Sequence, residues 1–541
     1  MIKNNIISCD VLVIGGGGAG IRAAIAAREK GADVFIASKS RIGYGNNTFI
    51  SKGVFAAATG WSNSFDSPQA HTKDTIEGGR YINDKRLVRK VAEGSPKQID
   101  FLEACGVKFS RKDGKIRVTH TPGHSYPRHV AGEHHTGRDL IIPLRNYAIK
   151  TGVRFGEGVF ITRLFTSEDH IAAAAGIDHK GNFLSISANR IVIATGGFAQ
   201  IYLHNNNASG MTGDGLALAF NLGLSIKDME FVQFYPTALG KRGNRLLLYE
   251  AIIFDAKAVL KNSIGDDILV KYGLYDPLRM TRDRLSRSIM KEILDGRSIS
   301  NGVLLDLSTV KEADLKRIAS FLPSMKNGYK DGLIVSPTAH FTMGGIVINE
   351  EAETTVQGLF AAGEVCSGVH GANRLGGNAL AEVFVLGVIA GENAAKTALK
   401  VKRPKFPEKE LLKEERRIEA SYFNGHRDEK DLRMSLKEIM WESVGIIRNT
   451  KGVERALDTI TELNSCVPDI YVRDRSALIK SLELKNMLLI SEMVCRAALL
   501  RKESRGAHYR EEYPQEDNDN WLKNIFIRKE GSGMKLEVVP I

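Results

Sequence analysis

The sequence predicts an α/β fold of the dinucleotide-binding, Rossmann-like kind, followed by a helical region. Three observations support this prediction: a glycine run at residues 15–20 directly after a buried-strand pattern, a second glycine-containing strip at residues 358–364, and helical periodicity from Glu408 to about Lys502. At 541 residues the chain is too long for one compact core. Two or three domains are therefore expected.

The N-terminal segment has the pattern of a nucleotide-binding βαβ unit. Residues 10–14, Asp-Val-Leu-Val-Ile, predict a buried strand, and an alanine-rich helix is expected to follow through about Lys30. Gly15, Gly17 and Gly20 stand at the three glycine positions of the dinucleotide fingerprint. This spacing lets a pyrophosphate lie on the helix N-terminus and brings helix and strand close together.

The second expected strand, residues 33–37, ends differently from the strand of an NAD enzyme. An Asp or Glu for the ribose is expected there, but Ser38 and Lys39 occupy the place. Further along, the strip Ala194-Thr195-Gly196-Gly197 ends another apolar run, and residues 358–364 read Gly-Leu-Phe-Ala-Ala-Gly-Glu. Both strips are typical of chain crossings beside a bound dinucleotide.

Three further strips, far apart in the chain, supply two arginines and two histidines among glycines. They are residues 281–287 with Arg282, residues 340–345 with His340, and residues 370–378 with His370 and Arg374. Together with the glycine-rich N-terminus, they resemble the flavoprotein subunit of the fumarate reductase and succinate dehydrogenase family, to which L-aspartate oxidase is related. The resemblance implies an FAD-dependent oxidoreductase that transfers a hydride between FAD and a carbon–carbon double bond beside a carboxylate.

The resemblance also implies a role for each residue of these strips. Arg374, with His340 or His370, is expected to clamp the carboxylate, since a guanidinium binds it bidentately and stays charged. Arg282 matches the family's proton donor, and Glu250 is the candidate that hands a proton on to it. The substrate is expected to be an α,β-unsaturated carboxylate, with fumarate as the default.

For the cofactor, the resemblance implies contacts from several separate segments. A Ser-Lys pair at the end of the second strand is found in fumarate reductases and L-aspartate oxidases, and Glu364 is expected to bind a ribitol or ribose hydroxyl. The expected FAD-binding residues are Gly15, Gly17, Gly18, Ala19, Gly20, Ser38, Lys39, Asn47, Thr48, Gly53, Ala194, Thr195, Gly196, Asp214, Glu364, Asn378, Ala379 and Leu380.

The expected architecture is discontinuous. An FAD-binding domain of the glutathione-reductase type comprises residues 1–234 and 339–400, and an α+β capping domain for the substrate, residues 235–338, is inserted into it. A Pro-containing charged linker, residues 402–407, leads to a C-terminal helical bundle, residues 408–541.

Two departures from the family pattern bear on the chemistry. Asn47 stands before Thr48 where many respiratory members have the histidine that bonds to the flavin, so FAD is expected to be noncovalent and reduction of the acceptor to be favoured. Tyr235 and Tyr249 stand where the family has the histidine and threonine that hold the second carboxylate. Phenols can donate hydrogen bonds, but they can equally stack on an apolar group, so the identity of the enoate stays open.

Three alternatives compete with an enoate reductase. L-aspartate oxidase shares a strip like residues 236–239, but its ammonium-binding glutamate is absent from residues 121–125, which would leave a buried charge unpaired. Adenylylsulfate reductase has a similar scaffold and more different catalytic strips. A noncatalytic electron-transfer flavoprotein would not need Arg282, His340 and Arg374 together.

Composition limits the partners. The five cysteines have no C-x-x-C spacing and the histidines of residues 120–135 have no helical ligand spacing, so no metal or iron–sulfur site is expected in this chain. By resemblance, the electrons come from an iron–sulfur subunit.

The net charge of +12 predicts a solvated basic surface without a nucleic-acid motif. No apolar run reaches membrane-spanning length, so we expect a cytoplasmic protein, or one held at the inner face of a membrane through a partner.

Overall fold

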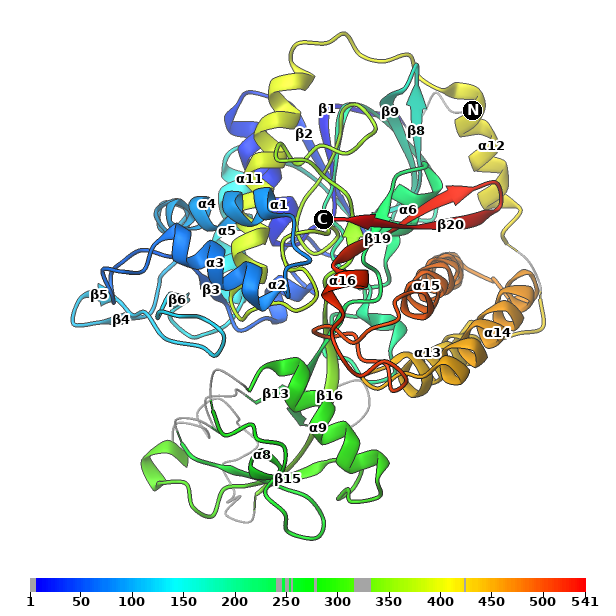
Figure 1. Cartoon of the computed structure of the whole chain (residues 1–541). Helices are drawn as coiled ribbons and strands as arrows, with labels where there is room; N and C mark the ends of the chain where they lie inside the picture. The colour runs from blue at the N-terminus through cyan, green and yellow to red at the C-terminus, as the bar shows by residue number, and fades with distance from the viewer. Residues whose placement is uncertain are drawn as a thin grey trace.

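The computed structural model describes residues 6–239, 246–248, 253, 256–276, 280–315, 332–422 and 425–541. Figure 1 shows a large sheet-containing domain, an inserted lobe below it around β15, and a group of C-terminal helices at one side. Tyr249 and Glu250, two of the residues singled out in the sequence, lie outside the described residues.

The large domain is built on a seven-stranded sheet with the order β7-β2-β1-β10-β9-β8, in which β18 also pairs with β10. The pairs β1–β2, β1–β10, β2–β7 and β10–β18 are parallel, whereas β8, β9 and β10 form an antiparallel meander. The bounds are β1 Ile6–Ile14, β2 Val34–Ser38, β7 Arg154–Glu157, β8 Phe160–Ser167, β9 His170–Ile177, β10 Phe183–Ile193 and β18 Leu359–Ala361.

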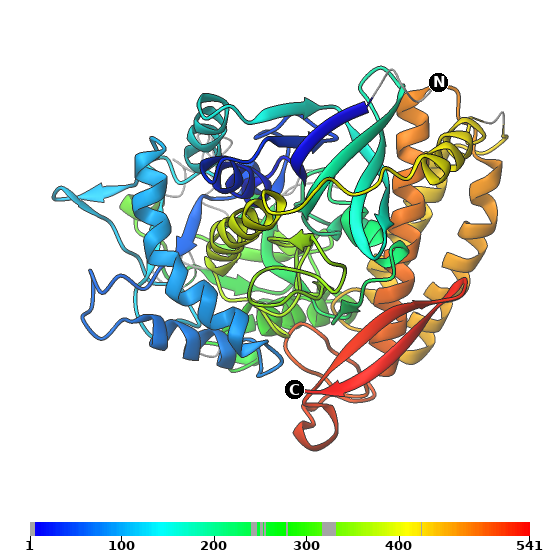
Figure 2. The same ribbon diagram turned by 90° about the horizontal axis from the view of Figure 1, so that it is seen from above.

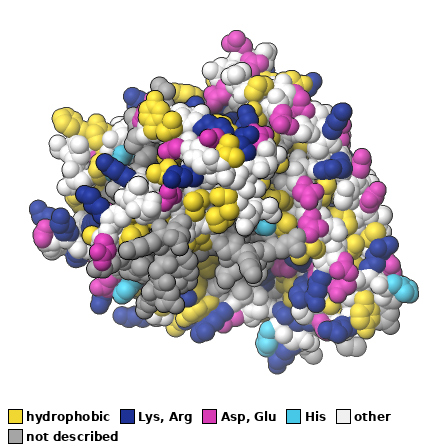
Figure 3. Space-filling model, turned by 90° about the horizontal axis from the view of Figure 1, so that it is seen from below, with side chains coloured by type: hydrophobic (Ala, Val, Ile, Leu, Met, Phe, Trp, Pro, Cys, Tyr) yellow, Lys and Arg dark blue, Asp and Glu magenta, His cyan; other side chains and the backbone are white. Residues whose placement is uncertain are grey.

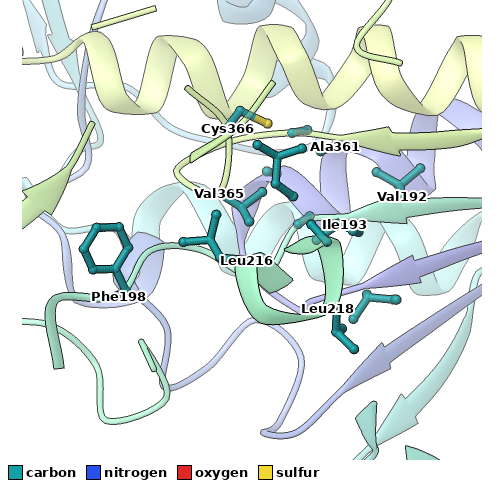
Figure 4. Close-up of a cluster of buried hydrophobic side chains, with 14 of the residues drawn as sticks. Val192, Ile193, Phe198, Leu216, Leu218, Ala361, Val365 and Cys366 are labelled. Atoms are coloured by element: carbon teal, nitrogen blue, oxygen red, sulfur yellow. The ribbon is translucent and has the colours of Figure 1, made fainter. Parts of the chain in front are cut away.

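Two helices pack closely on this sheet, α1 (Gly18–Glu29) and α11 (Asn378–Ala398). Their close approach needs glycine, because a Cβ on Gly391 would lie 2.1 Å from the carbonyl oxygen of Ala23. Between the sheet and α6 (Asp214–Asn221), Val192, Ile193 and Leu216 belong to the main hydrophobic core (Figure 4).

The helix α11 is long and apolar enough to cross a membrane by length and composition alone. However, 72% of its most apolar window is buried inside the fold, where the helix contacts α1, α4 and the central sheet. Its hydropathy is thus explained by its place as a core helix.

The remaining elements of the large domain form its left side in Figure 1 and the loops around the sheet's carboxyl edge. The short strands β3 and β6 pair with each other, as do β4 and β5. The bounds are α2 Asn47–Ile50, β3 Val54–Ala56, α3 Pro68–Gly78, α4 Lys85–Ala104, β4 Arg111–Lys112, β5 Lys115–Ile116, β6 His129–Ala131, α5 Arg138–Lys150 and the 3-10 turn η2 Ala199–Ile201.

The inserted lobe has its own five-stranded sheet, ordered β13-β12-β16-β15-β14, and its own apolar core that includes Leu260, Leu285 and Val335. Two of its strands, β12 and β16, continue into the large domain, so the boundaries expected at residues 234 and 339 fall inside strands. The bounds are β12 Val232–Leu239, β13 Leu246–Leu247, β14 Val259–Lys261, α8 Ile268–Lys271, α9 Arg282–Leu294, β15 Val303–Asp306 and β16 Leu333–Thr342.

The C-terminal segment begins with four helices, three of which have side-chain N-caps. Asp428, Asn449 and Asp474 each accept a hydrogen bond from a backbone N–H of the first turn that follows. The bounds are α12 Glu408–Glu419, α13 Glu429–Val444, α14 Thr450–Cys466, η4 Val467–Asp469 and α15 Arg475–Leu500.

After the short helix α16 (Asn518–Trp521), the chain ends in a hairpin that the sequence pattern did not predict, β19 (Lys523–Glu530) and β20 (Gly533–Pro540). It extends a sheet ordered β17-β11-β19-β20, in which β11 is Ile226–Lys227 and β17 is Gly345–Ile346. Seen from above in Figure 2, the hairpin lies across one end of the C-terminal helices. Its pairing partner lies about three hundred residues earlier in the chain, so no local pattern could indicate it.

A buried ionic network ties the C-terminal strip to the large domain. Arg501 bonds to Glu230 at 2.6 Å and to Glu503 at 2.9 Å, and all three side chains are fully buried. Arg505 bonds to Glu503 at 2.7 Å and donates to the carbonyl oxygen of Arg80 at 3.1 Å. Arg505 therefore has a packing role. On the face shown in Figure 3, Lys and Arg side chains are interspersed with Asp and Glu.

Replacing Arg501 should destabilise the protein strongly. Arg501→Met leaves the Glu230 carboxylate buried beside one fewer cation, which we expect to cost about 3–5 kcal/mol of unfolding free energy. Calorimetry should show a lower Tm, and Arg501→Met/Glu230→Gln should recover part of the loss. The matched control is Arg496→Met, which breaks a partly exposed pair with Glu492 and should change stability by less than about 0.5 kcal/mol. Equal Tm values for the two single variants would contradict this.

Candidate active site

One cavity of about 1210 Å³ runs from the glycine run at residues 15–19 to the strips that carry Arg282, His340 and Arg374. It lies along the carboxyl edge of the central sheet, where β1, β2 and β10 end and loops begin. Most of the cofactor residues expected from the sequence line it: Gly15, Gly17, Gly18, Ala19, Ser38, Lys39, Asn47, Thr48, Ala194, Thr195, Gly196, Asp214, Glu364, Ala379 and Leu380.

At the glycine end, the backbone geometry requires residues without side chains. Gly15 has φ +119°, and a Cβ there would lie 2.2 Å from the carbonyl oxygen of Ala194. The N–H of Gly18 donates to the hydroxyl of Thr48 at 3.2 Å. Gly20 does not line the cavity; a Cβ on it would lie 2.0 Å from the carbonyl oxygen of Gly15, so it permits the close approach of α1 to β1.

Lys39 is held by neighbouring carboxylates. Its ammonium group lies 2.6 Å from both Asp214 and Glu483 and 2.8 Å from the hydroxyl of Thr212. Burial opposes the charge on Lys39, but the two carboxylates raise its pKa. Lys39 thus joins the end of β2 to α6 and α15 while it lines the cavity.

Asn47, at the start of α2, and Glu364, shortly after β18, are joined by a hydrogen bond. The amide of Asn47 donates to Glu364 at 3.0 Å and to Asn207 at 2.6 Å, and its oxygen accepts from the N–H of Ala208 at 3.0 Å. Burial raises the pKa of Glu364 to about 6, although hydrogen bonds from Asn47 and Thr342 oppose the shift. Both oxygens of Glu364 already accept hydrogen bonds from the protein, so its contact with a cofactor hydroxyl stays a prediction.

Two other expected cofactor residues do not line the cavity. Gly53 has φ +63°, and a Cβ there would lie 2.2 Å from the carbonyl oxygen of Thr136, so it serves a turn. Asn378 uses its side chain inside the protein, 2.8 Å from Nε2 of His71 and 2.9 Å from the hydroxyl of Thr75. Like Gly20, Gly53 and Asn378 do not line the cavity but contact residues next to it.

The opposite end of the cavity brings together Arg282, Tyr235, His340 and Arg374, which come from four segments that are distant in sequence. The guanidinium of Arg282, at the start of α9, lies 4.7 Å from the ring centroid of Tyr235 in β12. The rings of Tyr235 and His340 meet edge to face at 5.4 Å. The guanidinium of Arg374 lies 4.7 Å from the ring centroid of Phe341. They meet because β12 pairs with β16, which places Tyr235 opposite Thr338.

Gln233 is a residue of this site that the sequence pattern did not reveal. It is fully buried, and its oxygen lies 3.4 Å from Nη1 of Arg282. Its amide nitrogen donates to the carbonyl oxygen of Arg374 at 2.8 Å and to Asn373 at 2.9 Å. One side chain therefore bridges the two arginines. Only its place two residues before Tyr235 on the strand, on the same face, could have indicated this.

The positive charge of this end resides on the arginines. Nδ1 of His340 lies 3.1 Å from the amide oxygen of Asn206. Burial, together with the charges of Arg374 and Arg282, lowers the pKa of His340 well below its usual range. The imidazole is therefore neutral at ordinary pH, whereas the guanidinium groups keep their charge.

The structure does not bring His370 to the cavity. Its Nε2 lies 2.9 Å from Glu382 on α11, and its ring packs edge-on against Phe341 at 5.0 Å. His370 thus lies behind Phe341 and supports the site indirectly. A direct contact between His370 and the substrate stays a prediction that this placement does not support.

The histidine-rich segment of residues 120–135 contains a buried ion-paired arginine. Arg128 is fully buried and lies 2.9 Å from both Asp66 and Asp74, so it does not reach the cavity as a carboxylate ligand. Within the described part of the chain, no three His, Cys, Asp or Glu side chains are grouped to hold a metal ion.

Comparison with known proteins identifies two family models that match separate parts of the chain. The FAD binding domain model matches residues 10–380, and the fumarate reductase flavoprotein C-term model matches residues 433–541. One subunit of the CoM/CoB fumarate reductase of Methanothermobacter marburgensis is 36% identical over 98% of both chains. Quinol fumarate reductase of E. coli superimposes with a TM-score of 0.93 at 30% identity, covering 99% of this chain and 97% of that one.

A more distant likeness supports the fold alone. Adenylylsulfate reductase of Archaeoglobus fulgidus superimposes with a TM-score of 0.83 at 19% identity, over 100% of this chain and 97% of that one. With the quinol fumarate reductase match, it confirms the predicted fold class.

The cavity fits FAD, which the domain match and the relatives indicate as the cofactor. It is long enough to connect Ser38 at one end with Arg374 at the other, and glycines leave its wall open where the backbone must approach a ligand. The hydroxyl of Thr195 lines the cavity and has no hydrogen-bond partner among the described residues. A buried hydroxyl of this kind is available to the cofactor.

The raised pKa of Glu364 predicts a pH effect on the FAD-free protein. Below about pH 4.5 the carboxyl is protonated in both states, whereas ionising it in the folded state requires about pH 6. Stability should therefore fall by about 2 kcal/mol as pH rises through this window. Glu364→Gln should remove that part of the slope of Tm against pH, and Glu351→Gln, at an exposed position, should not. An unchanged slope in Glu364→Gln would contradict the assignment.

Proposed function

The chain belongs to the fumarate reductase and succinate dehydrogenase flavoprotein family, and from that premise we propose that it reduces an α,β-unsaturated carboxylate, with fumarate as the default substrate. Membership makes it an FAD-dependent oxidoreductase. The single observation that supports a carboxylate substrate is the bridge through Gln233, which holds two arginines at one end of the FAD cavity.

The two arginines have different tasks in the proposed reaction. Arg374 binds the substrate carboxylate and draws electron density from the double bond, because its guanidinium stays charged when buried. FAD, when bound, supplies the hydride. Arg282 then donates a proton to the carbon that becomes basic. The neutral ring of His340 orients the carboxylate without adding a further buried charge.

Two residues in this proposal, Glu250 and Tyr249, lie outside the part of the chain that the structure describes. Glu250 is the proposed relay that returns a proton to Arg282, and Tyr249 is the proposed second partner for the far end of the substrate. Within the described residues, Tyr235 is the side chain at that end whose ring contacts both Arg282 and His340. A phenol can donate to a second carboxylate, which is why fumarate is kept as the default.

An amino-acid substrate is less well supported. The loop that would recognise its ammonium contributes Thr119, His120, Thr121 and Pro122 to the cavity wall, and none of these is an anion. Among the described residues that line the cavity, the acidic ones are Asp214, which is bound to Lys39, and Glu364, which is bound to Asn47 and Thr342. An ammonium group would therefore lack a dedicated carboxylate at the arginine end.

The cofactor is proposed to be held without a covalent bond. Asn47 lines the cavity at the position where the family's histidine forms that bond, and an amide cannot form it. Its hydrogen bonds to Glu364 and Asn207 instead fix Asn47 in the cavity wall. Loss of the covalent bond favours reduction of the acceptor over oxidation of the saturated acid.

The electrons must come from outside this chain. Its five cysteines are free, and three of them, Cys9, Cys366 and Cys495, are buried. We therefore propose that the donor is an iron–sulfur subunit, in an assembly of the cytoplasm or of the inner face of a membrane. Fumarate reductase homologues that are named as subunits support a multi-subunit assembly.

Anaerobic stopped-flow measurement tests the proposed reaction directly. We expect chemically reduced protein to regain the absorbance of oxidised FAD rapidly when fumarate is added, because the two arginines activate the enoate. Succinate serves as the control that should leave the reduced absorbance unchanged. If fumarate has no effect, fumarate is the wrong substrate, and monocarboxylate or aryl enoates should then be added in the same assay. Failure of all three classes would refute enoate reduction.

Arg282 should be essential for turnover and dispensable for the cofactor. Arg282→Lys and Arg282→Ala should retain FAD and lower kcat by at least about 10³-fold, since a proton donor typically contributes 10²–10⁴-fold. The matched control is Arg284→Lys, two residues along α9, where the side chain is exposed. This variant should keep kcat within about threefold, in line with the small effect of most surface substitutions. Near-normal kcat in Arg282→Ala would remove it from the role.

A further inference from the structure

Between Arg374 and the first turn of α11, the Gly376–Gly377 peptide is held by two histidines. The carbonyl oxygen of Gly376 lies 2.8 Å from Nε2 of His124 and 2.9 Å from Nε2 of His129. Both imidazoles are buried, and their rings meet edge to face at 5.0 Å. Two side chains thus bind a single backbone oxygen.

These contacts determine where the ring protons lie. A carbonyl oxygen only accepts hydrogen bonds, so Nε2 of both histidines carries the proton. Nδ1 of His129, which carries no proton, accepts a hydrogen bond from the hydroxyl of Thr121 at 2.5 Å. Nδ1 of His124 accepts a hydrogen bond from Nη1 of Arg128 at 3.3 Å. Every nitrogen of the pair therefore has a partner when both rings are neutral.

The surroundings keep the two rings neutral. Burial lowers the pKa of His129 to about 3, and the charges of Arg282 and Arg128 act in the same direction. Burial also lowers the pKa of His124 well below its usual range, aided by His129, His71 and Arg128. The anions of this cluster, Asp66 and Asp74, are committed to Arg128. Neither histidine can therefore act as an acid, because its one proton is held by Gly376.

The Gly376–Gly377 peptide lies between the two histidines and the end of the cavity that contains Arg282. A Cβ on Gly377, which has φ +77°, would lie 2.7 Å from Nε2 of His129. A Cβ on Gly376 would lie 3.7 Å from Nη2 of Arg282 and 3.0 Å from Cγ2 of Thr121. The carbonyl oxygen of Gly377 accepts from the N–H of Ala56 at 3.2 Å. A side chain at Gly377 would therefore clash with His129, and one at Gly376 would be tight against Thr121.

We propose that His124 and His129 are positioning residues, which lock the Gly376–Gly377 peptide and thereby set Arg374, Arg282 and the first turn of α11 against bound FAD and the enoate. The peptide is trans, so the N–H of Gly377 points away from the two imidazoles. Without the two donors, the glycines can rotate, because neither has a side chain to restrict them. The kinetic part of this inference rests on the proposed function.

The test compares variants that remove or keep a donor. His129→Phe fills the space without a donor, and His129→Gln keeps an N–H group; the same pair is made at His124. We expect the Phe variants to lower kcat roughly 10–100-fold with KM changed less, since misplacing reacting groups by about 1 Å can cost 10²-fold. The Gln variants should recover most of kcat. His134→Phe, at an exposed histidine, is the control and should leave kcat unchanged.

Two further readouts separate positioning from a purely structural effect and from failure of the proposed function. FAD content and Tm should stay near those of the unmodified protein in the Gln variants. The midpoint potential of bound FAD, measured without substrate, should shift in His129→Phe and not in His129→Gln. If no enoate is reduced by the unmodified protein, the proposed function fails, but the potentials still decide this inference. Equal potentials in all three proteins, or equal loss of kcat in the Phe and Gln variants, would overturn it.

Discussion

The arrangement of Arg282, Tyr235, His340 and Arg374 at one end of the cavity depends on the pairing of β12 with β16. The two strands carry Gln233 opposite Phe341 and Tyr235 opposite Thr338, and both run from the large domain into the inserted lobe. Side chains of alternate residues share a face of a strand, so Gln233 and Tyr235 point the same way. Gln233 then bonds to Arg282 on α9 and to the backbone of Arg374. One strand pair thus brings the parts of the site together.

Charge is distributed in this site according to what each residue type tolerates when buried. Guanidinium groups are protonated before the reaction begins, so Arg282 and Arg374 are cations beside the cavity. The imidazoles of His124, His129 and His340 have lowered pKa values and become neutral hydrogen-bonding groups. The described part of the site therefore places two positive charges beside neutral imidazoles, an arrangement that suits an anionic substrate.

Contacts between residues far apart in the chain connect the C-terminal region to the elements around the cavity. Arg501 bonds to Glu230, two residues before β12, and β19 pairs with β11, the strand that precedes β12 in the chain. Lys39 joins the end of β2 to Asp214 on α6 and Glu483 on α15. The C-terminal region thus supports both ends of the cavity, although it contributes none of the described lining residues.

The sequence by itself determined the nucleotide-binding βαβ unit, the cofactor and the family. Gly15 and Gly20 could be predicted because a close backbone approach excludes side chains at fixed local spacing, and Gly17 stands at the middle position of the same motif, where it lines the cavity. Arg282, His340 and Arg374 could be named by resemblance, and they do meet at one cavity.

Only the tertiary structure decided which side chains use their polar groups inside the protein. His370 faces Glu382, Asn378 faces His71, and His124 and His129 hold Gly376, so none of these roles follows from residue type. The terminal hairpin was missed for the same reason, since its partner β11 is distant in sequence. Local spacing fixes backbone geometry, whereas hydrogen-bond partners are chosen by long-range packing that the sequence pattern does not contain.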